Sequence, residues 1–292
     1  MFIVSPGLGS PGVLTYDPDG AFSGLWGSGQ GPGEFQGAAR ILTASGDVLV
    51  QDLTTLIHVL SPDRELRRYI RGVPIASTSP VALSDTVLAV PRRVEAGERP
   101  VQLFDLRSGE RIGAAGPLRG PDQEQVPVHV ASSRGGGLWV GTRPGRFEHW
   151  TLESDEPSIR LRLEDAWLRS LDPARRPTMD LADAVRDVHL WEDPDTGWLW
   201  VLAVVLAPGE TGMPEVEPGA PLPADFFSPR RMERTMNTVL SVVDPLERVV
   251  LANVVLNLVA WQFVEDGQVV AFREDEDGFQ WAEVLTFTLH GR

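Results

Sequence analysis

The sequence predicts an all-β fold that repeats a unit of four short strands. Three observations carry this prediction: polar turns recur about every 45 residues, tight-hairpin sequences lie between them, and long apolar stripes at helical spacing are missing. A four-stranded unit of that length has the spacing of a β-propeller blade. Because six such turns occur, the sequence predicts a six-bladed propeller with four-stranded antiparallel blades.

The outer two strands of each unit flank a polar turn. These turns lie near Pro18, Pro62, Leu106, Ser154, Pro245 and His290. The first three are 44 residues apart, and the later steps are 48, 91 and 45 residues. We interpret the step of 91 residues as one blade with a large insertion, because only one more pair of inner strands lies inside it.

The inner two strands of five units form predicted hairpins. They cover residues 39–52, 79–92, 127–143, 187–204 and 259–275, and each has β-rich runs around a turn that contains Gly, Asp or Ser. The first unit lacks an innermost strand and the last lacks an outermost one. Propellers close by pairing the two chain ends, so we expect N-terminal closing strands to be missing upstream of Met1. An incomplete ring that is stable as it stands is the alternative. Residues 1–292 are predicted to form a single propeller domain.

The glycine-rich segment GSGQGPGEF precedes a strand over Arg40–Thr43. A phosphate-binding loop would lead into a helix, so we interpret this segment as a joint between two blades. Together with the following ILTASGDVLVQDLTTLIHVLSPDRELRRYI, it resembles the blade signature of NHL-type six-bladed propellers, bacterial envelope-associated members in particular. The resemblance covers residues 13–72 and implies an extracytoplasmic location. Its second-strand aspartate is Asp52, which later blades replace with arginine.

Composition limits the partners. The net charge is −15 and all 26 basic residues are arginine, so nucleic acid is not an expected partner. The longest apolar run, WLWVLAVVLA at 198–207, is too short to span a membrane, so we expect no membrane insertion. The chain has no cysteine, which excludes disulfides and thiolate metal sites, and its start shows no signal peptide. We expect a monomer.

A predicted ligand site lies on the face formed by the blade joints and the loops between second and third strands. Several arginines map to that face, where guanidinium groups offer planar donor forks to an anion. The alternative is that they pair with nearby acids such as Glu98, Asp187 and Glu274 and hold blades together. The predicted ligand-binding residues are Arg40, Arg92, Arg143, Arg186, Arg273 and Asp52.

The insertion at residues 207–237 is rich in proline and glycine. Loops of this length are usually functional or disordered. Phe226 and Phe227, followed by Arg230 and Arg231, suggest a lid over the same face or a docking peptide, although an inert insertion is also consistent with this composition.

Two functions follow from the sequence. The first is a non-enzymatic binding module that recognises an anionic small ligand or a peptide, with no catalytic residue, no cofactor and no metal. The second is a metal-dependent hydrolase or lyase of the sugar-lactonase type, with a divalent ion held by acids such as Asp52, Asp187 and Glu274. Such an enzyme needs three or four convergent ligands, whereas the strand ends here carry mainly arginine, so the sequence favours binding.

Overall fold

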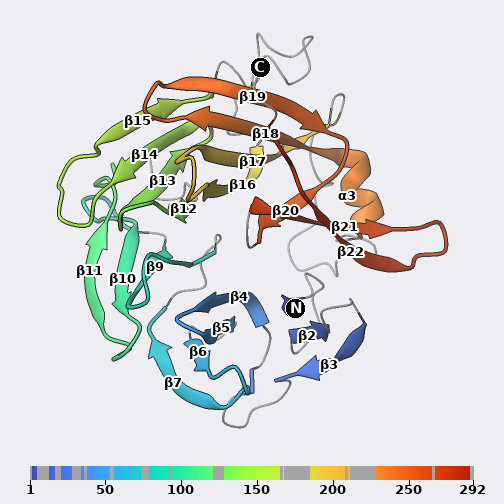
Figure 1. Ribbon diagram of the computed structural model, residues 1–292, viewed down its shortest axis with the longest axis horizontal. Helices are drawn as coiled ribbons and strands as arrows, with labels where there is room; N and C mark the ends of the chain where they lie inside the picture. The colour runs from blue at the N-terminus through green and yellow to red at the C-terminus, as the bar shows by residue number, and fades with distance from the viewer. Residues whose placement is uncertain are drawn as a thin grey trace. The chain divides into compact units, whose positions relative to one another are not determined.

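In the computed structural model, the secondary structure of the described residues is almost entirely short antiparallel strands (Figure 1). The structure describes residues 2–4, 13–16, 21–27, 34–35, 38–52, 56–73, 79–92, 94–120, 128–164, 167, 185–207, 210, 228–264 and 267–289.

The strands form six antiparallel sheets in which neighbours in the sheet are also neighbours in the chain. Four sheets have four strands: β4 (Ala38–Ala44), β5 (Asp47–Asp52), β6 (Leu56–Leu60) and β7 (Leu66–Arg71); β8 (Val81–Ala82), β9 (Val87–Pro91), β10 (Val101–Asp105) and β11 (Arg111–Ala115); β12 (His129–Ser132), β13 (Leu138–Arg143), β14 (Arg146–Trp150) and β15 (Ile159–Arg162); β16 (Val185–Glu192), β17 (Leu199–Leu206), β18 (Met236–Asp244) and β19 (Val249–Leu256). Two have three strands: β1 (Phe2–Val4), β2 (Val13–Tyr16) and β3 (Phe22–Trp26); β20 (Ala260–Phe263), β21 (Val269–Glu274) and β22 (Gln280–Leu285). This topology confirms an all-β propeller with four-stranded antiparallel blades.

The predicted count of six four-stranded blades is wrong for the described part of the chain. Four sheets are complete, and the sheets β1-β2-β3 and β20-β21-β22 have three strands each. The prediction counted one blade for every outer turn, although a turn needs only two strands and a blade needs four. The turns predicted near Pro18 and His290 lie outside the described residues.

The structure confirms all five inner hairpins predicted from the sequence, because the two strands of each are hydrogen-bonded neighbours. In the hairpin of β4 and β5, Ala44 pairs with Asp47 across a two-residue turn. The turn residues Ser45 and Gly46 have φ of 53° and 77°, which is the left-handed pair that a two-residue hairpin of matching twist requires. All of β5 is buried, as expected for an inner strand covered on both faces.

The β4–β7 and β8–β11 blades share one apolar core. Leu49, Ile57 and Ile70 of the first blade belong to the same buried cluster as Leu88 and Phe104 of the second. Full burial of each such side chain contributes about 1.5–3 kcal/mol. This core fixes the two blades against each other, which matters for the site described below.

The chain divides into two compact units. The first comprises Met1–Ser132, Gly136–Leu138 and Trp150–Glu156, and the second comprises Ser133–Gly135, Trp139–His149 and Pro157–Arg292. The first unit therefore holds the blades β4–β7 and β8–β11 whole, and the second holds the blade β16–β19 and the sheet β20–β22. The prediction of a single propeller domain over residues 1–292 stays a prediction.

The joint before β4 is held by a buried phenylalanine. The N–H of Phe35 donates to the carbonyl of Gly27 at 2.6 Å, and the Phe35 side chain is 1% exposed. Its ring meets Trp26 and His58 edge to face, with centroids 5.6 and 5.2 Å away. Because this joint leads into strand β4, as the sequence predicts, it does not have the loop-to-helix form of a phosphate-binding loop.

The insertion between β17 and β18 contains a short helix that the sequence analysis did not predict. Leu206 pairs with Met236, so the insertion leaves and re-enters the same blade. Helix α3 (Pro229–Thr235) begins at Ser228, whose side chain accepts from the N–H of Arg231, with proline in the first turn. Serine followed by proline is a helix start signal, and it stands directly before this segment.

A hydrogen-bond network in the second unit ties the turn after β12 to the end of β16. Glu192 accepts hydrogen bonds from Ser133 Oγ (2.8 Å), from the N–H of Arg134 (2.8 Å) and from Trp139 Nε1. His149 Nε2 lies 2.8 Å from Ser133 Oγ. Burial lowers the pKa of His149, and the charge of Glu192 opposes this effect. The imidazole is therefore neutral at pH 7.

Within the described residues, no helix is long and apolar enough to cross a membrane.

Candidate functional site

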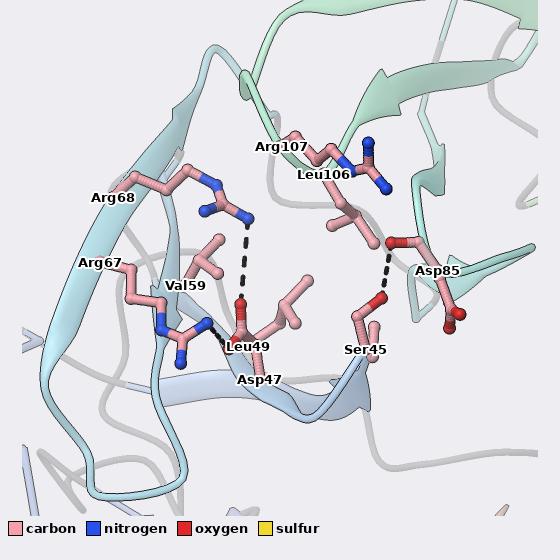
Figure 2. A pocket seen from close by; sticks show the side chains of 10 residues that line it. Ser45, Asp47, Leu49, Val59, Arg67, Arg68, Asp85, Leu106 and Arg107 are labelled. Atoms are coloured by element: carbon pink, nitrogen blue, oxygen red, sulfur yellow. Dashed lines mark hydrogen bonds and ion pairs between the residues drawn. The ribbon is translucent and has the colours of Figure 1, made fainter.

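A cavity of about 400 Å³ lies between the β4–β7 and β8–β11 blades, at the end where their hairpin turns meet (Figure 2). Asp47, which lines the cavity, and Asp52 are the first and last residues of β5. At roughly 3.4 Å per residue, they lie about 17 Å apart along the strand. The predicted site face is therefore at the other end of these blades. The residues that line the cavity are Ala44, Ser45, Asp47, Leu49, Val59, Arg67, Arg68, Asp85, Leu106 and Arg107.

An irregularity in β7 brings two neighbouring arginines to this cavity. Val59 pairs with Arg68, whereas Leu60 pairs with Leu66, so Arg67 is one extra residue in β7. In a regular strand, side chains at adjacent positions point to opposite faces, but a β-bulge suspends this alternation. Arg67 and Arg68 both point to Asp47 as a result (Figure 2).

Asp47 is the buried charge at the base of the cavity. Its side chain is 8% exposed, and Arg67 Nη1 lies 2.7 Å from Oδ1. Arg68 Nη2 lies 3.9 Å from Oδ2, which is a looser contact. The Nε of Arg68 is buried and has no hydrogen-bond partner among the described residues. Asp47 Oδ1 also has no hydrogen-bond partner among the described residues, so its contact with Arg67 is an ion pair without hydrogen-bond geometry. Part of the donor capacity of Arg68 is therefore unused.

The turn between β10 and β11 supplies the opposite wall. Asp105 Oδ1 accepts from the N–H groups of Arg107 (2.9 Å) and Ser108 (2.6 Å), which closes the turn. Gly109 has φ of 75°, and a Cβ there would lie 3.1 Å from the carbonyl oxygen of Tyr69 in β7. Glycine thus lets this turn approach the neighbouring blade, and the approach places Leu106 and Arg107 at the cavity.

The third wall is the turn between β8 and β9. Ser45 Oγ donates to the main-chain carbonyl of Asp85 at 2.5 Å, which joins the inner turns of the two blades. The Asp85 carboxylate and the Arg107 guanidinium are both exposed, and neither forms an ion pair within the described residues. Three arginines and two aspartates line the cavity, so its formal charge is +1 on a chain of −15.

The charge on Asp105 is expected to stabilise the turn in a pH-dependent way. Hydrogen bonds from Ser108, first of all from its main-chain N–H, lower the pKa of Asp105 below 3.8. A carboxyl with a lowered folded pKa contributes stability above its unfolded pKa and loses it as the pH falls through the folded value. The variant Asp105→Asn keeps the acceptor and removes the charge. We expect its thermal midpoint to lie below that of the wild type at pH 6, and the difference to shrink below about pH 3.8. A difference that stays constant from pH 6 to pH 3 would contradict this role.

The predicted site residues of the first unit are only partly available to a ligand. Asp52 ends β5, is 3% exposed, and accepts from His58 Nε2 at 2.9 Å and from the N–H of Leu56 at 3.3 Å. Arg92 Nη2 donates to Glu98 at 2.6 Å. With the Gln102 amide turned so that its oxygen faces Arg92, that oxygen also accepts from Arg92 Nη1 at 3.0 Å. Arg40 lies half-buried on β4, opposite Gln51.

The predicted residues of the second unit do not form one described cluster. Arg273 on β21 donates to Glu283 Oε2 (2.9 Å) and to Glu233 Oε1 of α3 (2.6 Å). The Glu283 contact, followed by that of Glu233, raises the pKa of Arg273 above its ordinary value. Arg186 is exposed on β16, and Arg143 ends β13 with a side chain outside the described set. Arg92 and Arg273 thus match the alternative in which these arginines pair with acids.

The predicted lid is described only at its C-terminal end. Phe226 and Phe227 lie outside the described residues, whereas Arg230 and Arg231 lie in the first turn of α3. The ion pair of Arg273 with Glu233 attaches this helix to β21. The insertion is therefore anchored at its end next to β18.

In the described parts of the chain, the acids that were expected to hold a metal do not come together at one site. No set of three or more His, Asp or Glu side chains there has a metal-binding arrangement. Asp52 pairs with His58, and Asp187 Oδ2 lies 3.2 Å from His189 Nε2. The acidic turn after Glu192 is a hairpin turn, in which Asp193 accepts from the N–H of Asp195 and from Thr196 Oγ1.

Sequence reasoning missed the cavity because its charged residues come from three separate turns and from a bulge. Two signals were present. The segment RELRRYIR concentrates four arginines against one glutamate, and the turn positions near Pro62 and Leu106 recur at the blade period, which brings them to the same end of successive blades.

Comparisons with known proteins identify no family. No protein-family model matches the chain, and no curated protein matches its sequence. Similar solved structures include the WD40 β-propeller domain of Doa1, with 9% identity, a TM-score of 0.47 and coverage of 81% of this chain and 60% of that one. The β-propeller domain of Cps50 (Swd1) from Myceliophteria thermophila has 11% identity and a TM-score of 0.43, with coverage of 82% and 66%. A chain of the mitotic checkpoint complex has 12% identity and a TM-score of 0.47, with coverage of 94% and 74%.

This chain thus spans less than two thirds of the length of the first two structures. The resemblance to NHL-type propellers is not confirmed by these comparisons. The assignment of the fold rests on the strand order and register described above.

Proposed function

We propose that this chain is a non-enzymatic β-propeller binding module that holds an anionic group of its partner in the arginine-lined cavity. The observation that carries the proposal is the cavity of about 400 Å³, which is lined by Arg68 and Arg107. The Nε of Arg68 has no hydrogen-bond partner and Arg107 forms no ion pair among the described residues. Guanidinium forks bind carboxylate and phosphate oxygens in pairs, and a partly enclosed site strengthens such charge-assisted bonds.

The cavity supports this function better than the predicted face does. The guanidinium groups of Arg92 and Arg273 each already donate to carboxylates, so an anion would have to displace a bound acid there. At the cavity, a carboxylate can enter beside Arg68 and Arg107 while Asp47 keeps its contact with Arg67. The face with Arg40, Arg143 and Arg186 stays a prediction, and no described feature favours the metal-dependent hydrolase.

The proposal is tested by titrating succinate into the wild type and three variants, with the thermal midpoint as the measure. Arg68→Gln and Arg107→Gln each remove one guanidinium from the cavity. A hydrogen bond to a charged group contributes about 1.5–3 kcal/mol, so each variant is expected to raise the apparent Kd at least tenfold. Arg162→Gln is the matched control, because Arg162 is an exposed arginine on the outer strand β15.

The control is expected to stay within twofold of the wild type. If Arg162→Gln weakens succinate as much as the cavity variants do, the binding reflects overall charge and the proposal fails. It also fails if succinate causes no shift in the wild type.

A further inference from the structure

We propose that the hairpin of β21 and β22 docks an arginine-rich segment of a protein partner on the face that carries Phe279 and Trp281. The hairpin belongs to the second unit, whereas the arginine-lined cavity belongs to the first, so this inference goes beyond the proposed function. Two features carry it: a pair of exposed aromatic rings on one face, and the excess of carboxylates around them.

The register of the hairpin places both rings on the same face. Strands β21 and β22 pair without irregularity over their whole length. The main-chain N–H of Asp275 donates to the carbonyl of Phe279 at 3.0 Å, which continues the pairing by one step. Alternate residues of a regular strand share a face, so Phe279, Trp281 and Glu283 point to one side, each about 7 Å from the next. Arg273 lies on this face too, because its Nε donates to Glu283.

Both rings are exposed and lack an aromatic partner. Phe279 is 69% exposed and Trp281 is 43% exposed. Among the described residues neither ring has an aromatic or cation–π contact, whereas Trp261 in the same sheet packs edge to face against Phe272. The hairpin extends beyond α3 in Figure 1, so this face is open to a partner. Aromatic side chains are the usual anchors of protein interfaces.

The turn between the two strands adds carboxylates beside the rings. Asp275 lies opposite Phe279, and its Oδ1 accepts from the N–H groups of Asp277 (3.0 Å) and Phe279 (2.8 Å). Glu276 and Asp277 are exposed and form no ion pair within the described residues. The turn therefore presents three negative charges next to an aromatic ring, which favours a cation at this position.

The arginine of this face does not neutralise it. Arg273 donates to Glu283 at 2.9 Å and to Glu233 of α3 at 2.6 Å. Two carboxylates on one guanidinium leave one excess negative charge near Trp281, in addition to the charges of the turn. The whole face is thus aromatic and acidic.

An arginine-rich segment matches both properties. A guanidinium stacks on an aromatic ring and also pairs with a carboxylate. In an extended segment every second side chain lies on the same side, about 7 Å apart, which is the spacing of Phe279 and Trp281. Anionic partners are disfavoured by the acidic turn. A symmetric contact with a second copy is disfavoured as well, because it would bring two acidic turns together. An uncharged lipid surface is the alternative that the test includes.

The test measures binding of three probes by isothermal titration: the blocked peptide GRVRVRG, its matched control GQVQVQG, and uncharged phosphatidylcholine vesicles. We expect the wild type to bind the arginine peptide at least tenfold more tightly than the glutamine peptide, and not to bind the vesicles. Phe279→Ser and Trp281→Leu should each weaken the arginine peptide at least fivefold without a change of charge. Leu246→Ser is the matched control, because Leu246 is an 82% exposed apolar residue of another turn in the same unit.

A second pair of variants separates the hairpin from the overall charge of the chain, which is −15. Glu276→Gln combined with Asp277→Asn should weaken the arginine peptide at least fivefold. Glu153→Gln combined with Glu156→Gln removes the same charge from exposed positions of the first unit and should stay within twofold of the wild type.

Equal losses in the two double variants would show that the peptide follows overall charge, and would overturn the inference. It is also overturned if Phe279→Ser has no effect, if the glutamine peptide binds equally, if the vesicles bind and the arginine peptide does not, or if no probe binds. None of these results bears on the cavity, which is tested with succinate.

Discussion

Replacing Glu192 with alanine is expected to lower the free energy of unfolding by about 3 kcal/mol. Glu192 accepts hydrogen bonds from Ser133, from the main chain of Arg134 and from the indole of Trp139, whose side chain is 1% exposed. Removing the carboxylate leaves the buried indole N–H without an acceptor, and an unsatisfied buried donor costs about 1–3 kcal/mol. The hydroxyl of Ser133, which also contacts His149 Nε2, loses its acceptor as well.

The measurement is chemical denaturation of the wild type, Glu192→Ala and Glu276→Ala. Glu276 is an exposed acid in the turn between β21 and β22, so its removal changes the net charge equally without breaking the network. We expect the control to stay within about 0.5 kcal/mol of the wild type, as is usual for exposed positions. Equal losses in the two variants would mean that the network contributes little.

Replacing Gly27 with alanine is expected to cost about 3 kcal/mol as well. Gly27 has φ of 78°, and a Cβ at this position would lie 2.1 Å from the ring of Phe35. A left-handed backbone costs about 1–2 kcal/mol for a residue with a Cβ, and forcing extra atoms into a packed core costs a further 1–3 kcal/mol.

The two contributions separate in a double-mutant cycle with Phe35→Leu. Leucine is smaller than phenylalanine, so the added methyl group meets less of a clash and mainly the backbone cost remains. We expect Gly27→Ala to cost about 1.5 kcal/mol in the Phe35→Leu background, half of its cost in the wild type. If the cost is the same in both backgrounds, Phe35 does not pack over Gly27 as described.

The strands of this protein were predictable from local sequence, because turn chemistry and alternation act over short distances. The turn at Ser45 and Gly46 needs two left-handed residues, and the sequence supplies them. Phe35 likewise appears in the motif GSGQGPGEF, and it anchors the joint that this motif predicts. The number of complete blades was not predictable in this way, because a turn identifies two strands and not the four that make a blade.

The site was less predictable because it depends on geometry that no local pattern encodes. Arg67 and Arg68 are neighbours in sequence, and regular alternation would send them to opposite faces of β7. The bulge opposite Val59 and Leu60 brings both to Asp47. Arg107 reaches the same cavity from another blade, through the close approach that Gly109 permits. The arginines chosen from the sequence lie at strand ends, where acids such as Glu98 and Glu283 already bind two of them.

The most direct test of the central claim is a crystal structure of this chain with succinate bound. We expect one carboxylate of succinate within hydrogen-bond distance of both Arg68 and Arg107. A succinate bound instead at the face with Arg40 and Arg92, or a cavity that stays empty, would contradict the proposed site.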